Sequence, residues 1–186
     1  MAEANGNGRI EIRLAGSGGQ GVVLAGVILA EAAILSGKNA AQSQAYGPQS
    51  RGGASRADVV IAQDAIGFPQ AQSLDVLLAL TREACERYSP DLRAGGLLVV
   101  DAGAGTDPPA GDWRVHALPI AETAAREVGN AIATNMVALG VLGGLTGVVG
   151  AEALERAIAA RVPARSRELN LRALAAGLRL AGAGGS

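Results

Sequence analysis

The stretch AGSGGQGVVLAGVILAEAA, residues 15–33, constrains the fold more strongly than any other part of the chain. Its glycines Gly16, Gly18 and Gly21 have the G-x-G-x-x-G spacing of a dinucleotide-binding turn. Residues 10–14 alternate between apolar and charged side chains just before the turn, which predicts a strand. We expect Gly18 to take a positive φ, because glycine lets such a turn lie close to its neighbours. A strand, a glycine turn and a helix in this order indicate an α/β fold.

The helix that follows the turn is expected to be deeply buried. Residues 21–36 are apolar on nearly all sides, and a helix of this kind packs against a sheet instead of facing water. Ala25 and Gly26 would let it approach the sheet closely, and Gly37 would end it.

The rest of the chain alternates between short apolar strands and helices. Apolar runs bounded by turn residues predict parallel strands buried on both faces at 57–62, 74–80 and 95–101, with weaker strands at 39–44 and 114–118. Helices are predicted at 81–93, with a break at Ser89-Pro90, and at 120–128, 151–161 and 165–180. The elements together predict a Rossmann-like, mostly parallel α/β sheet with helices on both faces and a helical C-terminal third. We expect one domain over 9–181, a disordered tail over 1–8 and a flexible tail over 182–186.

One long uncharged segment, between Glu127 and Glu152, calls for a membrane test. Its length would be sufficient to span a bilayer. It contains polar residues, among them Asn130 and Asn135, and glycines interrupt it repeatedly. We therefore predict a buried, closely packed helix and no membrane contact.

The composition excludes several classes of function. Basic residues number 16 and acidic residues 17, and aromatic residues are scarce, so no nucleic-acid surface is expected. Cys85 is the single cysteine, which excludes a disulfide framework and a four-thiolate metal or iron–sulfur site within the chain. His116 is the single histidine and is expected to be structural, so we predict no catalytic residue and no metal site. The polar N-terminus is unlike a signal peptide, and a reducing, cytoplasmic compartment follows by default.

The glycine turn has two interpretations. The N-terminus of the helix behind it presents unpaired N–H groups and a positive dipole end, which suit a phosphate. The same spacing also serves tight packing of a strand against a helix, or a subunit contact. An NAD site would further need an acidic residue about 20 residues on, and residues 33–42 contain none. Their only charge, Lys38, suits either a 2′-phosphate or a solvated surface position, so the turn is weak evidence for NAD.

A second motif, SQAYGPQSRGGASRADVVIA at residues 43–62, is predicted to contain a loop between two strands. Glycine and proline shape this loop, and Tyr46, Arg51 and Arg56 lie within it. Guanidinium groups in such a loop could bind a carboxylate or a phosphate. They could equally pair with local acidic residues or with a partner subunit.

Three segments of the sequence together resemble one family. They are GSGGQGVVLAGVILAEAA, YGPQSRGGASRADVVIA and GNAIATNMVALG, at residues 16–33, 46–62 and 129–140. In this order they are similar to the gamma subunit, or gamma domain, of 2-oxoacid:ferredoxin oxidoreductases, and most similar to 2-oxoglutarate-type members. The resemblance implies an enzyme complex that oxidatively decarboxylates a 2-oxoacid, with release of CO₂ and formation of an acyl-coenzyme A.

The resemblance also implies cofactors and partners outside this chain. Thiamine diphosphate, Mg²⁺ and iron–sulfur clusters are expected on alpha, beta and ferredoxin-like delta subunits, with ferredoxin as electron acceptor and coenzyme A (CoA) as a substrate. Residues 111–113 come nearest to a thiamine Gly-Asp-Gly signature and break it at Trp113, so the isolated chain is expected to be inactive. Candidate contacts to phosphate, CoA or a partner subunit are Gly16, Gly18, Gly19, Gln20, Gly21, Tyr46, Arg51, Arg56 and Asn135. The alternatives are a stand-alone NAD(P)-dependent dehydrogenase and a non-enzymatic nucleotide-binding scaffold.

Overall fold

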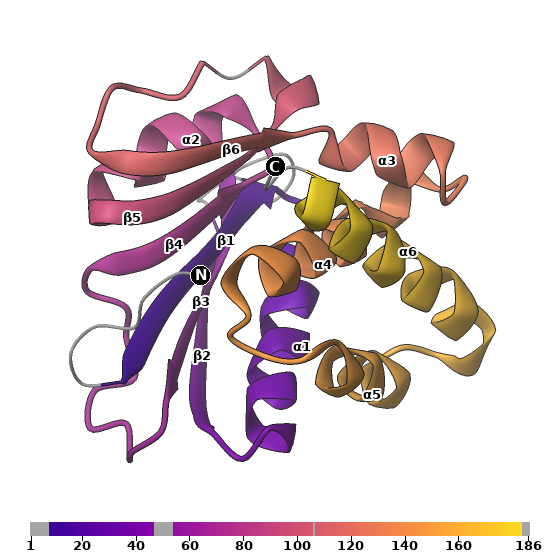
Figure 1. Cartoon of the computed structure of the whole chain (residues 1–186), viewed down its shortest axis with the longest axis horizontal. Helices are drawn as coiled ribbons and strands as arrows, with labels where there is room; N and C mark the ends of the chain where they lie inside the picture. The colour runs from indigo at the N-terminus through magenta and orange to yellow at the C-terminus, as the bar shows by residue number, and fades with distance from the viewer. Residues whose placement is uncertain (1–7, 47–53, 106, 184–186) are drawn as a thin grey trace.

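The computed structural model describes residues 8–46, 54–105 and 107–183, which form a six-stranded sheet and its helices (Figure 1). The strands are β1 (Arg9–Ser17), β2 (Asn39–Tyr46), β3 (Ala54–Ala62), β4 (Leu74–Ala79), β5 (Leu92–Asp101) and β6 (Trp113–Leu118). The α-helices are α1 (Val22–Leu35), α2 (Arg82–Tyr88), α3 (Ile120–Arg126), α4 (Thr134–Thr146), α5 (Ala151–Arg161) and α6 (Ala164–Ala183). Short 3-10 helices are η1 (Ser89–Asp91), η2 (Ala102–Ala104) and η3 (Ala131–Ala133). The predicted α/β class is confirmed.

The sheet is mostly parallel, with one reversed strand. Its order is β2-β3-β1-β4-β5-β6, and β1, β4, β5 and β6 are parallel neighbours. β3 lies antiparallel between β1 and β2, in a register that pairs Arg9 with Ala62 and Ser17 with Ala54. The prediction that residues 57–62 form a parallel strand is therefore wrong. The connection from β2 to β3 is too short for the dozen or more residues that a parallel crossover needs.

Helices cover both faces of the sheet. On one face α1 packs over β1, β2 and β3, and α3 to α6 extend this helical layer (Figure 1). On the other face α2 packs against β1 and β4. The neighbouring β1 residues Leu14 and Ala15 mark the two sides, because Leu14 joins the core under α1 and Ala15 joins the core under α2. The predicted two-sided cover and helical C-terminal third are confirmed.

The helix α1 ends as predicted, but it is not covered on all sides. Gly37 ends it with φ +76°, and a Cβ on Gly26 would lie 2.6 Å from a β3 side chain, so the close approach to the sheet requires glycine. Leu24, Ile34 and Leu35 are 38%, 58% and 38% exposed. The predicted burial against the sheet is confirmed, and α4 and α5 pack beside the helix.

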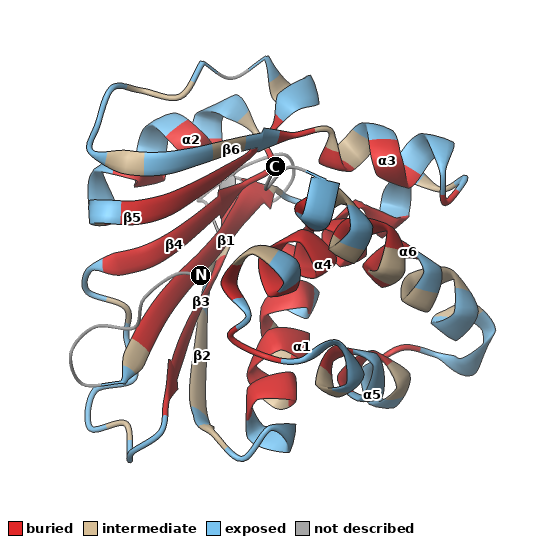
Figure 2. Ribbon diagram, viewed as in Figure 1, coloured by how far each residue is buried: buried red, intermediate tan, exposed pale blue. Residues whose placement is uncertain are grey.

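The helix α4 carries most of the uncharged segment and is buried on all sides (Figure 2). A Cβ on Gly140 would lie 2.3 Å from the Leu174 carbonyl oxygen, and one on Gly177 would lie 2.0 Å from that of Val137. The backbones of α4 and α6 therefore touch where these glycines lie. The predicted buried, closely packed helix is confirmed. No helix in the described part of the chain has the length and apolar character that a membrane crossing needs.

The expected tails fall at the limits of the described residues. Residues 1–7 and 184–186 lie outside them, and so do residues 47–53, which include Arg51. At the C-terminus α6 continues to Ala183, two residues beyond the boundary expected for the domain.

Candidate functional site

The motifs singled out in the sequence meet at the end of the sheet where the parallel strands terminate. β1 ends at Ser17 and leads through the glycine turn into α1. β3 begins beside it, with Ser55 opposite Gly16. β2 ends there as well, with Tyr46 opposite Ser55. In open α/β sheets ligands bind outside the carboxyl ends of the strands, so this end is the candidate site.

Gln20 closes the glycine turn from within. Its backbone N–H donates to the Ser17 carbonyl oxygen at 3.2 Å, and its side-chain Oε1 accepts a hydrogen bond from the Ser17 N–H at 2.7 Å. A Cβ on Gly16 would lie 2.4 Å from that Oε1. Gly16 thus leaves room for the Gln20 carboxamide. Its oxygen accepts the Ser17 N–H, which is then not available to a ligand.

Asn135 joins the turn from the third motif, at the start of α4. Its Nδ2 donates to the Gly21 carbonyl oxygen at 3.2 Å, and the residue is 6% exposed. A Cβ on Gly21 would lie 2.4 Å from Nδ2, so this glycine is needed for the contact as well as for its φ of +72°. Asn130 has a separate role, since its Oδ1 accepts from the Ile132 N–H at 2.9 Å and caps η3.

The outer part of the turn remains open. Gly18 and Gly19 are exposed, and α1 begins just after them with no acidic residue in its first turn. Positive φ falls on Gly19 and Gly21, so the expectation of positive φ at Gly18 is wrong. The first residue of the turn with positive φ is therefore Gly19, one position after the glycine that the G-x-G-x-x-G spacing indicated. Exposed glycines before a helix N-terminus can still receive an anionic group.

Arg56 lies within β3, not in the loop where the sequence motif placed it. Its guanidinium carbon lies 5.5 Å from the centroid of the Tyr88 ring, and its Nε lies 4.0 Å from Asp58 Oδ2. Arg13 also contacts this cluster, with Nε 2.6 Å from Asp58 Oδ1 and NH2 2.9 Å from Oδ2. Tyr88 and Asp58 were not predicted from the sequence, although a charged Arg13 in the middle of an apolar strand indicates that a buried acid is needed nearby.

The structure also locates Tyr46 and Lys38, which the sequence motifs singled out. Tyr46 is the last residue of β2. Lys38, offered as a 2′-phosphate contact or as a solvated surface residue, donates from Nζ to the Val148 carbonyl oxygen at 2.7 Å. It therefore ties the end of α1 to the connection between α4 and α5.

Neither Cys85 nor His116 lies in a reactive setting. Cys85 is fully buried in α2, and burial raises the pKa of its thiol, with the Glu86 carboxylate adding to the shift. A neutral, buried thiol is unreactive. His116 lies on the edge strand β6, opposite Val99. Across the ranges that the structure describes, no group of three or more His, Cys, Asp or Glu residues could hold a metal ion.

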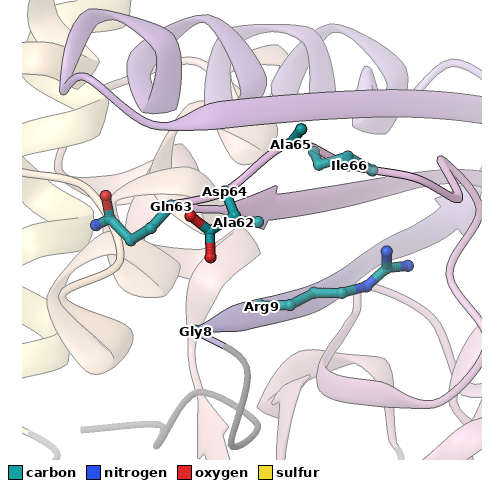
Figure 3. Close-up of a pocket in the computed structure, with 7 residues that line it drawn as sticks. All are labelled: Gly8, Arg9, Ala62, Gln63, Asp64, Ala65 and Ile66. Carbon is teal, nitrogen blue, oxygen red and sulfur yellow. The ribbon is translucent and has the colours of Figure 1, made fainter.

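A hollow of about 660 Å³ lies at the opposite end of the sheet (Figure 3). It is lined by Gly8, Arg9, Ala62, Gln63, Asp64, Ala65 and Ile66, none of which belongs to a site predicted from sequence. Nearby, Asp75 is 1% exposed and accepts from the Glu11 N–H at 2.6 Å. Burial raises the pKa of the Asp75 carboxyl, while this N–H and the Arg93 guanidinium oppose the shift. These contacts tie the starts of β1, β4 and β5 together.

The strand order departs from that of a dinucleotide-binding fold. In such folds the second strand lies beside the first and ends in the acid that holds the ribose. Here β3 occupies the place beside β1, and β2 lies one strand further out without an acidic residue. Neither the geometry nor the residues of the glycine turn therefore favour a dehydrogenase.

Comparison with known proteins gives a consistent result over nearly the whole chain. The family model described as pyruvate ferredoxin/flavodoxin oxidoreductase matches residues 11–180. The 2-oxoglutarate synthase subunit KorC of Methanothermobacter marburgensis is 45% identical, over 92% of this chain and 96% of that subunit.

Two solved structures are similar to this chain. The gamma subunit of a keto/oxoacid ferredoxin oxidoreductase from Geobacter sulfurreducens has a TM-score of 0.87 and 49% identity, over 95% of this chain and 98% of that one. A 2-oxoglutarate:ferredoxin oxidoreductase from Magnetococcus marinus, with 2-oxoglutarate, CoA and succinyl-CoA bound, has a TM-score of 0.86 and 25% identity. That match covers 94% of this chain and 31% of that chain.

Proposed function

Because the chain belongs to the pyruvate ferredoxin/flavodoxin oxidoreductase family, we propose that it is the gamma subunit of an enzyme that oxidatively decarboxylates 2-oxoglutarate. The observation that carries this proposal is the 45% identity to a 2-oxoglutarate synthase subunit over almost the full length of both chains. In the proposed reaction 2-oxoglutarate loses CO₂, its acyl group passes to the CoA thiol, and two electrons leave to ferredoxin. The products are succinyl-CoA, CO₂ and reduced ferredoxin.

The residues of this chain do not fit the cofactors of that reaction. The single cysteine, Cys85, is fully buried in α2, so the chain has no thiolate set for an iron–sulfur cluster. Residues 111–113 lack the last glycine of a thiamine signature. We therefore assign thiamine diphosphate, Mg²⁺ and the clusters to alpha, beta and delta subunits. Residues 9–181 act in this proposal as one gamma-type domain of the assembly.

The glycine turn is the proposed contact for an anionic group of CoA. Support comes from the exposed Gly18 and Gly19, which precede the N-terminus of α1. Gln20 and Asn135 fix the turn around them through the Ser17 N–H and the Gly21 carbonyl oxygen. Arg56 is the proposed contact to a neighbouring subunit or to the same anion, because its guanidinium is partly exposed beside Tyr88.

The substrate is tested on the enzyme purified with this chain in place. We expect turnover with 2-oxoglutarate, CoA and a ferredoxin-type acceptor to exceed turnover with pyruvate, a branched-chain 2-oxoacid or an aryl 2-oxoacid. The chain alone is expected to be colourless and inactive. A preference for another 2-oxoacid would overturn the proposed substrate, and activity of the chain alone would overturn the assignment of the cofactors to partner subunits.

The CoA contact is tested by placing a negative charge on the turn. Gly18→Asp is expected to raise the apparent KM for CoA about 10- to 100-fold, because like charges about 4 Å apart at a protein surface repel by several kcal/mol. The KM for the 2-oxoacid should stay unchanged. Gly67→Asp is the matched control, since Gly67 is exposed and a Cβ there would meet nothing within 4 Å. Equal KM values for CoA in the two variants would remove the glycine turn from the CoA site.

A further inference from the structure

One side of α1 is mostly apolar and only partly covered. With about 3.6 residues per turn, the half-buried and exposed residues of this helix fall on one side that spans roughly a third of its circumference. This α1 stripe consists of Val23, Leu24, Val27, Glu31, Ile34 and Leu35. Its most exposed members lie in the first and last turns, and Figure 2 shows the last turn in pale blue. A helix face of this length and character is suited to an apolar groove of another protein surface.

The only charged residue of the α1 stripe does not make it polar. The Glu31 carboxylate pairs with the Arg161 guanidinium of α5, so its charge is already matched within the chain. The remaining members are aliphatic. The stripe therefore lacks the charged outer face that a solvent-facing helix normally carries.

Another exposed apolar residue, Ile132, lies near the candidate site in sequence. Ile132 is 84% exposed and comes three residues before Asn135, whose side chain contacts Gly21. Leu24 comes three residues after Gly21. Exposed apolar side chains thus lie on both segments that lead to the contact between Gly21 and Asn135, namely η3 and the first turn of α1.

We propose that the α1 stripe docks into an apolar groove on a larger partner subunit of the same enzyme, an inference that rests on the proposed function. The choice of this partner rests on the Magnetococcus marinus relative, in which a region similar to this chain makes up 31% of a longer polypeptide. More than two thirds of that polypeptide lies outside the matched region and is joined to it covalently. The match with this chain covers 96% of the KorC subunit, so in that relative the additional part is not joined to the matched region. An apolar helix face supplies the association that such a separate subunit needs.

The proposal is tested by charging the α1 stripe in the enzyme assembled with its partner chains. Ile34→Lys is expected to lower the amount of the larger subunit that co-purifies with this chain at least about 10-fold, because an unpaired charge buried in an apolar contact strongly weakens that contact. Leu24→Glu, at the other end of the stripe, should act in the same way. Both charges suit their ends of the helix dipole, so the isolated variants should melt within about 2 °C of the parent.

Val115→Lys is the matched control. Val115 lies on β6, far from α1 in the strand order, and is 42% exposed. Co-purification should be unchanged in this variant, and the specific activity of the remaining Ile34→Lys complex should equal that of the parent. Assembly of Ile34→Lys and Leu24→Glu at the parental level would overturn the proposal, as would an equal loss in Val115→Lys. A change confined to self-association of the isolated chain would also overturn it, because the stripe would then bind a second copy. An intact complex that prefers another 2-oxoacid would refute the proposed substrate and leave the docking surface standing.

Discussion

The helices α1 and α4 are both apolar on nearly all sides, yet of the two only α4 is buried on all sides. α4 has no charged residue, and 11 of its 13 residues are buried. α1 has one charged residue, Glu31, and eight of its 14 residues are buried. The composition of a helix therefore indicates how much of its surface is best buried. Whether other elements of the same chain bury that surface depends on the fold.

The cause of the difference is the set of neighbours that each helix has. α4 is surrounded by α1, α3 and α6, and glycines let the α6 backbone reach it directly. α1 has the sheet on one side and α4 and α5 beside it, and Leu24, Ile34 and Leu35 on its remaining side are exposed. A partner subunit on the α1 stripe would give α1 the same complete cover that α6 gives α4.

The largest effect is expected from breaking the contact between α4 and α6. A Cβ on Gly177 would lie 2.0 Å from the Val137 carbonyl oxygen, and backbone cannot move aside as a side chain does. Gly177→Leu should therefore cost more than about 5 kcal/mol and leave a chain without a cooperative thermal transition. Circular dichroism against temperature measures this.

Gly182→Leu is the matched control for that experiment. Gly182 lies in the same helix, is exposed, and a Cβ there would meet nothing within 4 Å. This variant should melt like the parent. Equal melting of the two variants would show that α6 does not cover α4 as closely as the structure indicates.

The type and the ends of a helix or strand could be predicted from sequence where glycine or proline lies close to both of its ends. The helix predicted at 151–161 has those bounds, since Gly150 precedes it and Pro163 follows soon after. The direction of β3 could not be predicted from its own residues. Its apolar run is compatible with either direction, and only the length of the connection to β2 distinguishes them.

The candidate site was predicted only in part, because its geometry depends on tertiary contacts. The spacing of the glycines located the turn, but it could not tell that Gly19 takes the positive φ in place of Gly18. The contact between Asn135 and Gly21 joins residues more than a hundred positions apart, so no local pattern reveals it.

An intermediate effect is expected on the buried sides of the two helices. Leu139 of α4 and Ile28 of α1 are both 0% exposed. Leu139→Ala and Ile28→Ala should each lower the free energy of unfolding by about 2–5 kcal/mol, because each leaves a cavity in the core. Urea denaturation of the isolated chain measures both losses. If Ile28→Ala cost less than about 1 kcal/mol, α1 would be loosely packed on its buried side too, and the comparison with α4 would fail.

The smallest effect is expected on the uncovered side of α1, and it sharpens the comparison most. Ile34 is 58% exposed, so Ile34→Ala removes little buried surface, and the higher helix propensity of alanine offsets part of the loss. The free energy of unfolding of the isolated chain should change by no more than about 0.5 kcal/mol in urea denaturation, with the slope against urea unchanged. A loss above about 1.5 kcal/mol would mean that this chain itself covers Ile34. Measured in the assembled enzyme, the same truncation should weaken subunit association, because only there does the side chain leave water. If truncation of Ile34 leaves the stability of the isolated chain nearly unchanged but weakens subunit association, then the role of this side chain is to contact the partner subunit.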